Sequence, residues 1–380
     1  MSKLAVRLSV GLALALVMCG GVFAAPAAAP VTWQAHVGGA TPDEAVQAMA
    51  FLPTQLTIDE GDTVTWTFAP VHTVSFLSGG NPPDLVTMTP DGLLLNPAVA
   101  FPSGGPAYDG TGFVNSGVLP GGPDATSFSL TFSKAGTYNY VCLLHPGMAG
   151  QVVVQAAGAA YPETQASATA RGQAELYSKL SAGNTLIQDA RVSSRPADNG
   201  TMNYAVDNGI GGNQTTVLRF LPTELTINAG DSVTWTQNDP QEIHTVTFYD
   251  PAGEKPIFTD VQPQENGPPK FFIRNAGPEG GNTVDKVGFY NSGIMAPGQS
   301  YTLTFSKPGT YTYLCAVHAV EGQVGTIVVK EAGVAPTQPA QLPSTGTDSA
   351  LPLGWLAVAA LLAGLLGLLV RRAARSALNV

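Results

Sequence analysis

The chain has 380 residues, of which only 12% are charged, whereas glycine (43) and proline (30) are frequent. This balance disfavours long helices and favours short strands joined by many turns, and the length favours two domains with accessory segments. The formal net charge of −10 provides no basic footprint, so nucleic acid is excluded as an expected partner.

The first 29 residues have the pattern of a secretory signal peptide. Two basic residues precede the apolar run 8–17, and small residues follow at 24–29. A basic start, a short apolar centre and a small-residue end are typical of a segment that is removed after export. We therefore assign 1–29 to a signal peptide, with a lipoprotein anchored through Cys19 as the less favoured alternative.

An internal repeat then occupies most of the chain. Five segments recur in the same order: 51–58 as 220–227, 61–66 as 230–235, 72–76 as 244–248, 115–117 as 291–293, and 130–145 as 303–318. Within each copy, apolar residues alternate with polar ones, which predicts half-buried strands. Many short antiparallel strands favour a β-sandwich. We therefore expect an all-β fold with one domain at 30–156 and a second at 199–330.

The segment 157–198 between the repeats has a different composition. Residues 161–190 are rich in Ala, Gln, Glu and Ser, and Leu176 and Leu180 stand one helical turn apart. This spacing predicts a helix, followed by a loop through Asp198. We expect a partly helical linker.

The C-terminal region resembles a surface anchor. A linker rich in Pro and Ala, 331–346, ends in Leu-Pro-Ser-Thr-Gly, which matches the pattern that sortases cleave. The apolar run 351–370 is long enough to cross a bilayer, and the arginines after it predict a cytoplasmic C-terminus. We expect a transmembrane helix and a basic tail within 347–380. Both domains would then lie outside the cell, held at the membrane or, after sortase processing, at the cell wall.

Histidine and cysteine are scarce and occur at matched positions. The chain has five His and three Cys, and Cys19 lies in the signal peptide. The matched sets are His72, Cys142 and His145 in the first repeat, and His244, Cys315 and His318 in the second. One thiolate and two imidazoles with a weak axial thioether form a blue-copper site. Zinc is the rival metal, although a single thiolate with a thioether suits it less well.

Disulfide bonding accounts for the cysteines less well than a metal does. Each domain has a single Cys, which excludes a disulfide within it, and an interdomain disulfide would leave four matched histidines without a role. His36, the remaining histidine, has no counterpart in the second repeat and is interpreted as an ordinary strand residue.

The loop Cys142-x-x-His145-x-x-Met148 follows a Gly-Thr-Tyr-x-Tyr strand, with His72 far upstream. It resembles the plastocyanin and azurin family of cupredoxins. The resemblance implies a Greek-key β-sandwich in each repeat, one type 1 copper per domain, and a role in carrying single electrons between redox partner proteins. It also implies that His72, Cys142, His145 and Met148 are the copper ligands of the first domain.

The second repeat departs from this pattern because no methionine follows His318. Counting forward from His318 places Glu321 at the axial position, whereas counting back from Gly325 places Gln323 there. We favour Gln323, because an amide oxygen replaces methionine in stellacyanin-like members of the family and carries no charge to bury. The predicted ligands are thus His244, Cys315, His318 and Gln323, with Glu321 or no axial ligand as alternatives.

Three classes of function compete. Multicopper oxidases need His-x-His pairs and a His beside the Cys, and this chain has neither. We therefore expect a carrier rather than an enzyme, and no catalytic residues. Copper storage, resistance or surface scaffolding without electron transfer is the alternative, but the seven methionines are few for storage. With the loops placed as the resemblance implies, Leu143, Leu144, Pro146 and Val71 would form an apolar collar around His145, whose ring edge would pass electrons to a docked partner.

Overall fold

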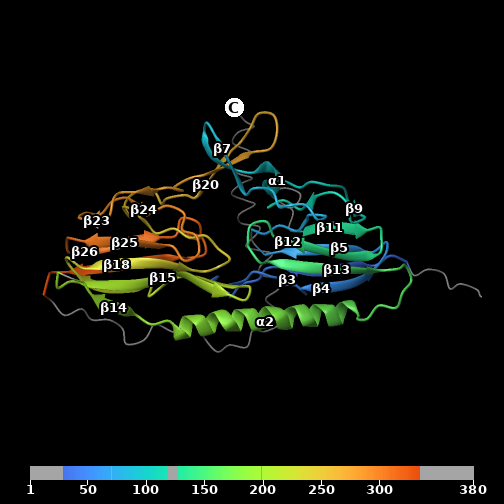
Figure 1. The fold of residues 1–380 in the computed structure, drawn as a ribbon, viewed down its shortest axis with the longest axis horizontal. Helices are drawn as coiled ribbons and strands as arrows, with labels where there is room; N and C mark the ends of the chain where they lie inside the picture. The colour runs from blue at the N-terminus through green and yellow to red at the C-terminus, as the bar shows by residue number, and fades with distance from the viewer. Residues whose placement is uncertain (1–28, 70, 119–126, 198, 334–380) are drawn as a thin grey trace, which may run out of the picture.

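The computed structural model describes residues 29–69, 71–118, 127–197 and 199–333 (Figure 1). The predicted signal peptide, the sorting motif and the transmembrane segment fall outside these residues, apart from Ala29. Within the described ranges, no helix is both long enough and apolar enough to span a bilayer.

The first repeat folds into two facing five-stranded sheets. One sheet has the order β3 (Phe51–Leu52), β1 (Thr32–Val37), β5 (Thr63–Phe68), β11 (Ser127–Phe132), β9 (Ala107–Tyr108). The other has the order β10 (Val114–Asn115), β6 (Ser75–Phe76), β12 (Gly136–Val141), β13 (Ala149–Gln155), β4 (Gln55–Asp59). Trp66, Phe76 and Phe132 are fully buried in the core between the sheets.

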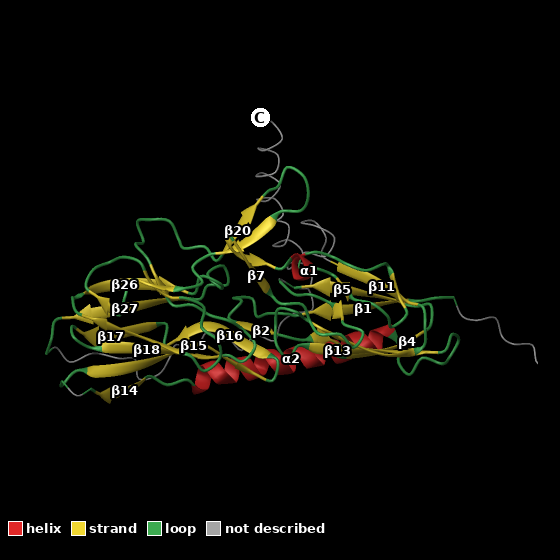
Figure 2. Cartoon of the chain, turned by 45° about the horizontal axis from the view of Figure 1, so that its top comes forward, coloured by secondary structure: helices red, strands yellow, loops and turns green. Residues whose placement is uncertain are grey.

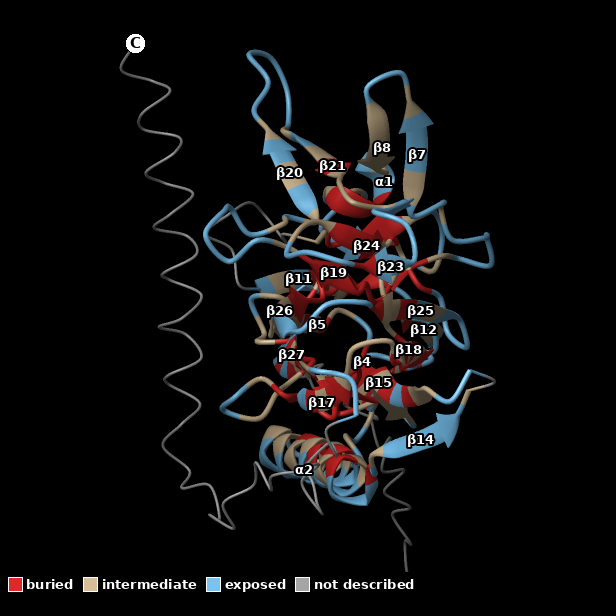
Figure 3. Cartoon of the chain, turned by 90° about the vertical axis from the view of Figure 1, so that its left-hand side faces the viewer, coloured by how far each residue is buried: buried red, intermediate tan, exposed pale blue. Residues whose placement is uncertain are grey.

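The second repeat forms a matching pair of sheets around Trp235, Phe248 and Phe305. One sheet has the order β16 (Thr215–Leu221), β15 (Met202–Gly212), β18 (Ser232–Asn238), β25 (Ser300–Phe305), β23 (Thr283–Val284). The other has the order β17 (Glu224–Asn228), β27 (Val324–Lys330), β26 (Gly309–Leu314), β19 (Thr247–Phe248), β24 (Tyr290–Ser292), β22 (Pro278–Glu279). Buried residues concentrate between the layers (Figure 3).

Two local predictions need correction. The sheets are mixed rather than antiparallel, because β1 runs parallel to β5 and β13 runs parallel to β4. The chain crosses between the two sheets, so strands that become neighbours can run in the same direction. The predicted loop before Asp198 also contains a strand, β14 (Ser193–Pro196), because its backbone pairs with the edge of β15.

The two halves share backbone hydrogen bonds. β2 (Val46–Ala48), from the first repeat, pairs antiparallel with β16, from the second. Gln47 lies opposite Thr216, and each stands four residues before a matched phenylalanine, Phe51 or Phe220. The same segment of each repeat therefore meets its own counterpart, as at an interface with two-fold symmetry.

A second shared sheet lies at the top of the molecule in Figure 1, next to the short helix α1 (Pro97–Ala100). It has the order β20 (Thr259–Gln262), β21 (Lys270–Ile273), β8 (Gly92–Leu95), β7 (Val86–Thr89). One hairpin comes from each repeat, and β8 pairs with β21 across the junction. The two halves are thus joined by strand pairing at two separate places.

The predicted linker helix is confirmed as α2 (Gln165–Asp189), which runs along both halves (Figures 1 and 2). Thr164 caps its N-terminus by accepting a hydrogen bond from the Ser167 backbone N–H at 3.2 Å. Leu180 packs with Val46 and Val217 in a third apolar cluster between the halves, and Leu176 lies against it. The helix therefore belongs to the packed structure of both repeats.

Candidate metal centres

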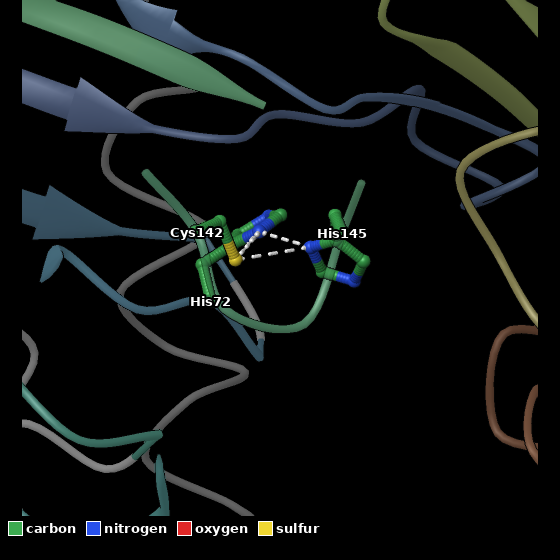
Figure 4. A group of neighbouring side chains, drawn as sticks. All are labelled: His72, Cys142 and His145. Atoms are coloured by element: carbon green, nitrogen blue, oxygen red, sulfur yellow. Dashed lines mark hydrogen bonds between the residues drawn. The ribbon is translucent and has the colours of Figure 1, made fainter. Parts of the chain in front are cut away.

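The first candidate site lies where strand ends meet in the first half (Figure 4). His72 precedes β6, Cys142 directly follows β12, and His145 lies in the turn between β12 and β13. The His72 and His145 Nδ1 atoms are 2.9 Å apart. Cys142 Sγ lies 3.4 Å from His145 Nδ1 and 3.9 Å from His72 Nδ1. All three side chains are buried, and the fold brings His72 from a distant part of the chain to Cys142 and His145, as predicted.

The donor set fits a metal ion. Ions bound by thiolate and imidazole sit about 2.0–2.3 Å from each donor, so three trigonal donors lie roughly 3.5–3.8 Å apart. The observed separations of 2.9, 3.4 and 3.9 Å bracket that spacing. One sulfur and two nitrogens form the trigonal set that blue-copper sites use.

Two neighbours shape this site. The Cys142 N–H donates to the Met148 carbonyl at 3.0 Å, which closes the loop, and Met148 is buried. At Gly38, with a φ of +71°, an added Cβ would lie 2.4 Å from His72 Nε2. Glycine is therefore required where the chain after β1 passes the ring of His72.

The second half repeats the arrangement. The His244 and His318 Nδ1 atoms are 3.3 Å apart, and Cys315 Sγ lies 3.8 and 3.5 Å from them. These three side chains are also buried. Gly209 contacts His244 in the same way as Gly38 contacts His72, because a Cβ added at Gly209 would lie 2.3 Å from His244 Nε2. Both cysteines are free thiols rather than members of a disulfide.

Gln323 occupies the place in the second half that Met148 holds in the first. The Cys315 N–H donates to the Gln323 carbonyl at 2.9 Å, the counterpart of the Cys142–Met148 bond. The Gln323 side chain is fully buried, and its Oε1 lies 2.9 Å from His244 Nδ1. Its Nε2 donates to Asn208 Oδ1 at 3.2 Å, which orients the oxygen toward the histidine.

Glu321 lies outside this cluster of donors. In the described residues, the donors that gather at this site are His244, Cys315 and His318, and the Glu321 carboxylate is not one of them. Its backbone carbonyl accepts a hydrogen bond from Arg219 Nη1 at 2.7 Å. Of the two residues that sequence counting left open, Gln323 is thus the one beside the donor set.

A buried hydrogen-bond network that was not predicted from the sequence positions both cysteines. Thr73 N–H donates to Cys142 Sγ at 3.4 Å, and the Thr73 hydroxyl accepts from Leu143 N–H at 2.8 Å. Ser75 links Thr73 to Asn115. In the second half the same bonds run through Thr245, Thr247 and Asn291. The repeated His-Thr and Asn-Ser-Gly segments could have indicated this network, because their polar side chains recur at matched positions, which is unusual for surface loops.

The electrostatics of both sites favour the thiolate. Burial opposes ionisation of the Cys142 thiol, but the charge and hydrogen bond of His145 outweigh it and hold the thiol pKa well below its ordinary value. Burial lowers the pKa of His145, but Glu242 and Cys142 raise it to about 10. Cys315 and His318 shift in the same directions for the same reasons. Because the thiolate is the metal-binding form of cysteine, each site is prepared for a metal ion.

Glu242, in the loop between β18 and β19, connects the two sites. Its Oε1 lies 3.0 Å from His145 Nε2, and its Oε2 lies 3.5 Å from His318 Nε2. Burial raises the pKa of Glu242, but the two histidines outweigh this effect and hold it well below its ordinary value. The sequence-based expectation that the edge of His145 faces an external partner is therefore wrong, because a carboxylate of the second half covers it.

These sheets and donor sets define a copper-binding β-sandwich protein, and comparisons with known proteins agree. Residues 206–330 match the family of copper binding proteins described as plastocyanin/azurin. Plastocyanin from Scenedesmus fuscus is 30% identical over 115 residues, which cover 30% of this chain and 88% of that protein. Chloroplastic plastocyanin from Tetradesmus obliquus is 30% identical over 113 residues, which cover 30% of this chain. The chain belongs to the plastocyanin/azurin family of copper-binding proteins.

Each match covers about one third of this chain. The chain spans 59% of the length of the Tetradesmus obliquus relative and 53% of a similar one from Silene latifolia. A solved purple cupredoxin from Nitrosopumilus maritimus is 21% identical with a TM-score of 0.21, covering 33% of this chain and 98% of that one.

Proposed function

We propose that this protein carries single electrons through two type 1 copper sites, one in each half. The observation that carries the proposal is the twice-repeated convergence of one buried thiol and two histidine Nδ1 atoms. The proposed ligands are His72, Cys142, His145 and Met148 in the first half, and His244, Cys315, His318 and Gln323 in the second. Copper bound there supplies a one-electron couple between its cuprous and cupric states.

The residues around each site would keep its geometry fixed. The buried Thr73 and Thr245 bonds hold the cysteine sulfurs, and Gly38 and Gly209 let the backbone pass against the buried histidines. Hydrogen bonds to the sulfur and burial are among the factors that set the potential of a copper–thiolate site. A rigid set of donors changes little between oxidation states, which suits electron transfer.

We further propose that the two halves are displayed outside the cell. The signal-peptide pattern of 1–29 and the motif, apolar run and basic tail of 342–380 support this location. Redox proteins would be the partners, the anchor would lie in the membrane, and sortase would be able to transfer the chain to the cell wall. No enzymatic activity is proposed, because the sequence has no His-x-His pair for a catalytic copper cluster.

Copper storage or resistance without electron transfer is the second candidate. The two buried sites favour the carrier, because storage calls for many accessible soft ligands. Reversible one-electron reduction of both sites would distinguish a carrier from a store.

The test is to load the full chain with copper and compare it with Cys142→Ser, Cys315→Ser and the double variant. We expect each single variant to lose one of two intense visible absorption bands, and the double variant to lose both. Copper EPR identifies the remaining site. A double variant that kept an intense band near 600 nm would contradict the ligand assignment.

A further inference from the structure

The ring edges of the two site histidines do not face solvent. His145 and His318 are each 7% exposed, and the Glu242 side chain between them is 9% exposed. Each ring presents Nδ1 to its own donor set and Nε2 to the same carboxylate. In the described part of the chain, the side on which an external partner would reach either histidine is therefore occupied by the other half.

Further contacts hold the first site against the second half. Gln241 Nε2 donates to the Pro146 carbonyl at 3.3 Å, and Gln214 Nε2 donates to the Gly147 carbonyl at 3.4 Å. Both carbonyls belong to the loop that carries Cys142 and His145. The β2–β16 pairing and helix α2 fix the halves around this contact, so the relation between the two sites does not depend on a flexible linker.

We propose that the two sites exchange electrons directly, with Glu242 as the positioning residue that links His145 to His318 across the interface. This inference rests on the proposed function, since it requires copper at both sites. One electron leaves the site of one half and the same electron arrives at the site of the other, so no atom is transferred and no external reagent is needed. The path runs through two imidazole rings and one carboxylate, with contacts of 3.0 and 3.5 Å.

The residue that bridges the two sites comes from the second half alone and has no equivalent in the first. Glu242 stands two residues before His244, and the matching position before His72 holds Pro70. One carboxylate therefore serves both sites. As an acceptor for the Nε2–H of each ring, it orients both histidines and makes them stronger donors, the role that outer carboxylates have for metal-bound histidine.

The test uses the full chain loaded with copper at both sites, and Glu242→Gln as the variant of nearly equal size. After rapid reduction of one site by a radiolytic pulse, the concentration-independent redistribution between the two absorption bands gives the internal rate. We expect Glu242→Gln to slow this rate at least ~tenfold. We also expect both reduction potentials to rise, because a negative charge that favours the oxidised ion is lost at both histidines.

The matched control is Asp43→Asn. Asp43 also carries a carboxylate across the interface, 3.8 Å from Arg219 Nη2, but it contacts neither site histidine. This variant should leave the internal rate and both potentials unchanged.

Nitrogen-15 NMR of histidine in the cuprous wild-type protein provides a readout that does not depend on the variant. The Nε2–H protons of His145 and His318 should exchange slowly with solvent in these spectra, because each donates to the buried Glu242 carboxylate. Rapid exchange of either proton, or an unchanged rate and unchanged potentials in Glu242→Gln with both bands intact, would overturn the inference. An intense band that persisted in the Cys142→Ser, Cys315→Ser double variant would instead refute the proposed function.

Discussion

The two halves share one architecture but differ at the fourth position of the metal site. The first half places the thioether residue Met148 in the loop after Cys142, and the second places the amide Gln323 after Cys315. The residues that hold the cysteines are otherwise equivalent in both halves. The repeat thus keeps the surroundings of the cysteine constant while it changes the residue proposed as the axial ligand, the ligand through which such sites tune their potential.

The largest expected effect tests whether the halves are stable independently. Trp66 and Trp235 are the matched, fully buried centres of the two cores. Replacing either with alanine should cost about 3–5 kcal/mol of unfolding free energy. Because the halves share two sheets, the protein should unfold in one transition, and each variant should lower the denaturant concentration at its midpoint. Two separate transitions, with only one displaced, would show that the halves unfold independently.

The next effect concerns the buried network behind each cysteine. Asn115→Ala and Asn291→Ala remove the amides that fix Ser75 and Thr247. Each should weaken copper binding in its own half by about 10–100-fold, as expected for residues that orient metal ligands. Competition with a chelator of known affinity measures this loss. Equal weakening at both sites after a single substitution would contradict the local role.

A ligand exchange sharpens the comparison directly. Gln323→Met should raise the potential of the second site, and Met148→Gln should lower that of the first. Each shift should be about 60 mV or more, which corresponds to a tenfold change in the relative affinity for the two oxidation states. Redox titration of the separate absorption bands gives both values. If both reduction potentials stayed unchanged after the exchange, the axial residue would not be the feature that distinguishes the halves.

The smallest effect concerns the helix that contacts both halves. Thr164→Ala removes the N-terminal cap of α2 and should cost about 1 kcal/mol. Thermal unfolding measures this loss. Thr164→Ser keeps the capping hydroxyl and serves as the control, so an equal loss in both variants would argue against the cap.

Local sequence patterns correctly predicted the features that involve residues close to one another in the chain. Cys142 and His145 come from one loop, and the Leu176–Leu180 spacing predicted helix α2 correctly. His72 was placed with them because its counterpart His244 recurs at the same point of the repeat.

Features that depend on how the halves meet were not predicted. Glu242 lies far along the chain from His145 and belongs to no motif, so only the assembled interface reveals its contact. The β2–β16 pairing joins segments from different repeats, and alternation within a strand does not identify its neighbour. Strand β14 was likewise missed because an edge of β15, rather than its own composition, determines its conformation.

The β2–β16 pairing also determines which part of this chain can exist alone. In the intact protein, each of these strands covers the other's open edge. A half released by cleavage between the repeats would expose unpaired backbone groups beside Val46 or Val217, together with the apolar surface that α2 covers. Such edges promote association with other chains. A separated half is therefore expected to aggregate or to pair with its own copies, so the smallest soluble unit is the pair.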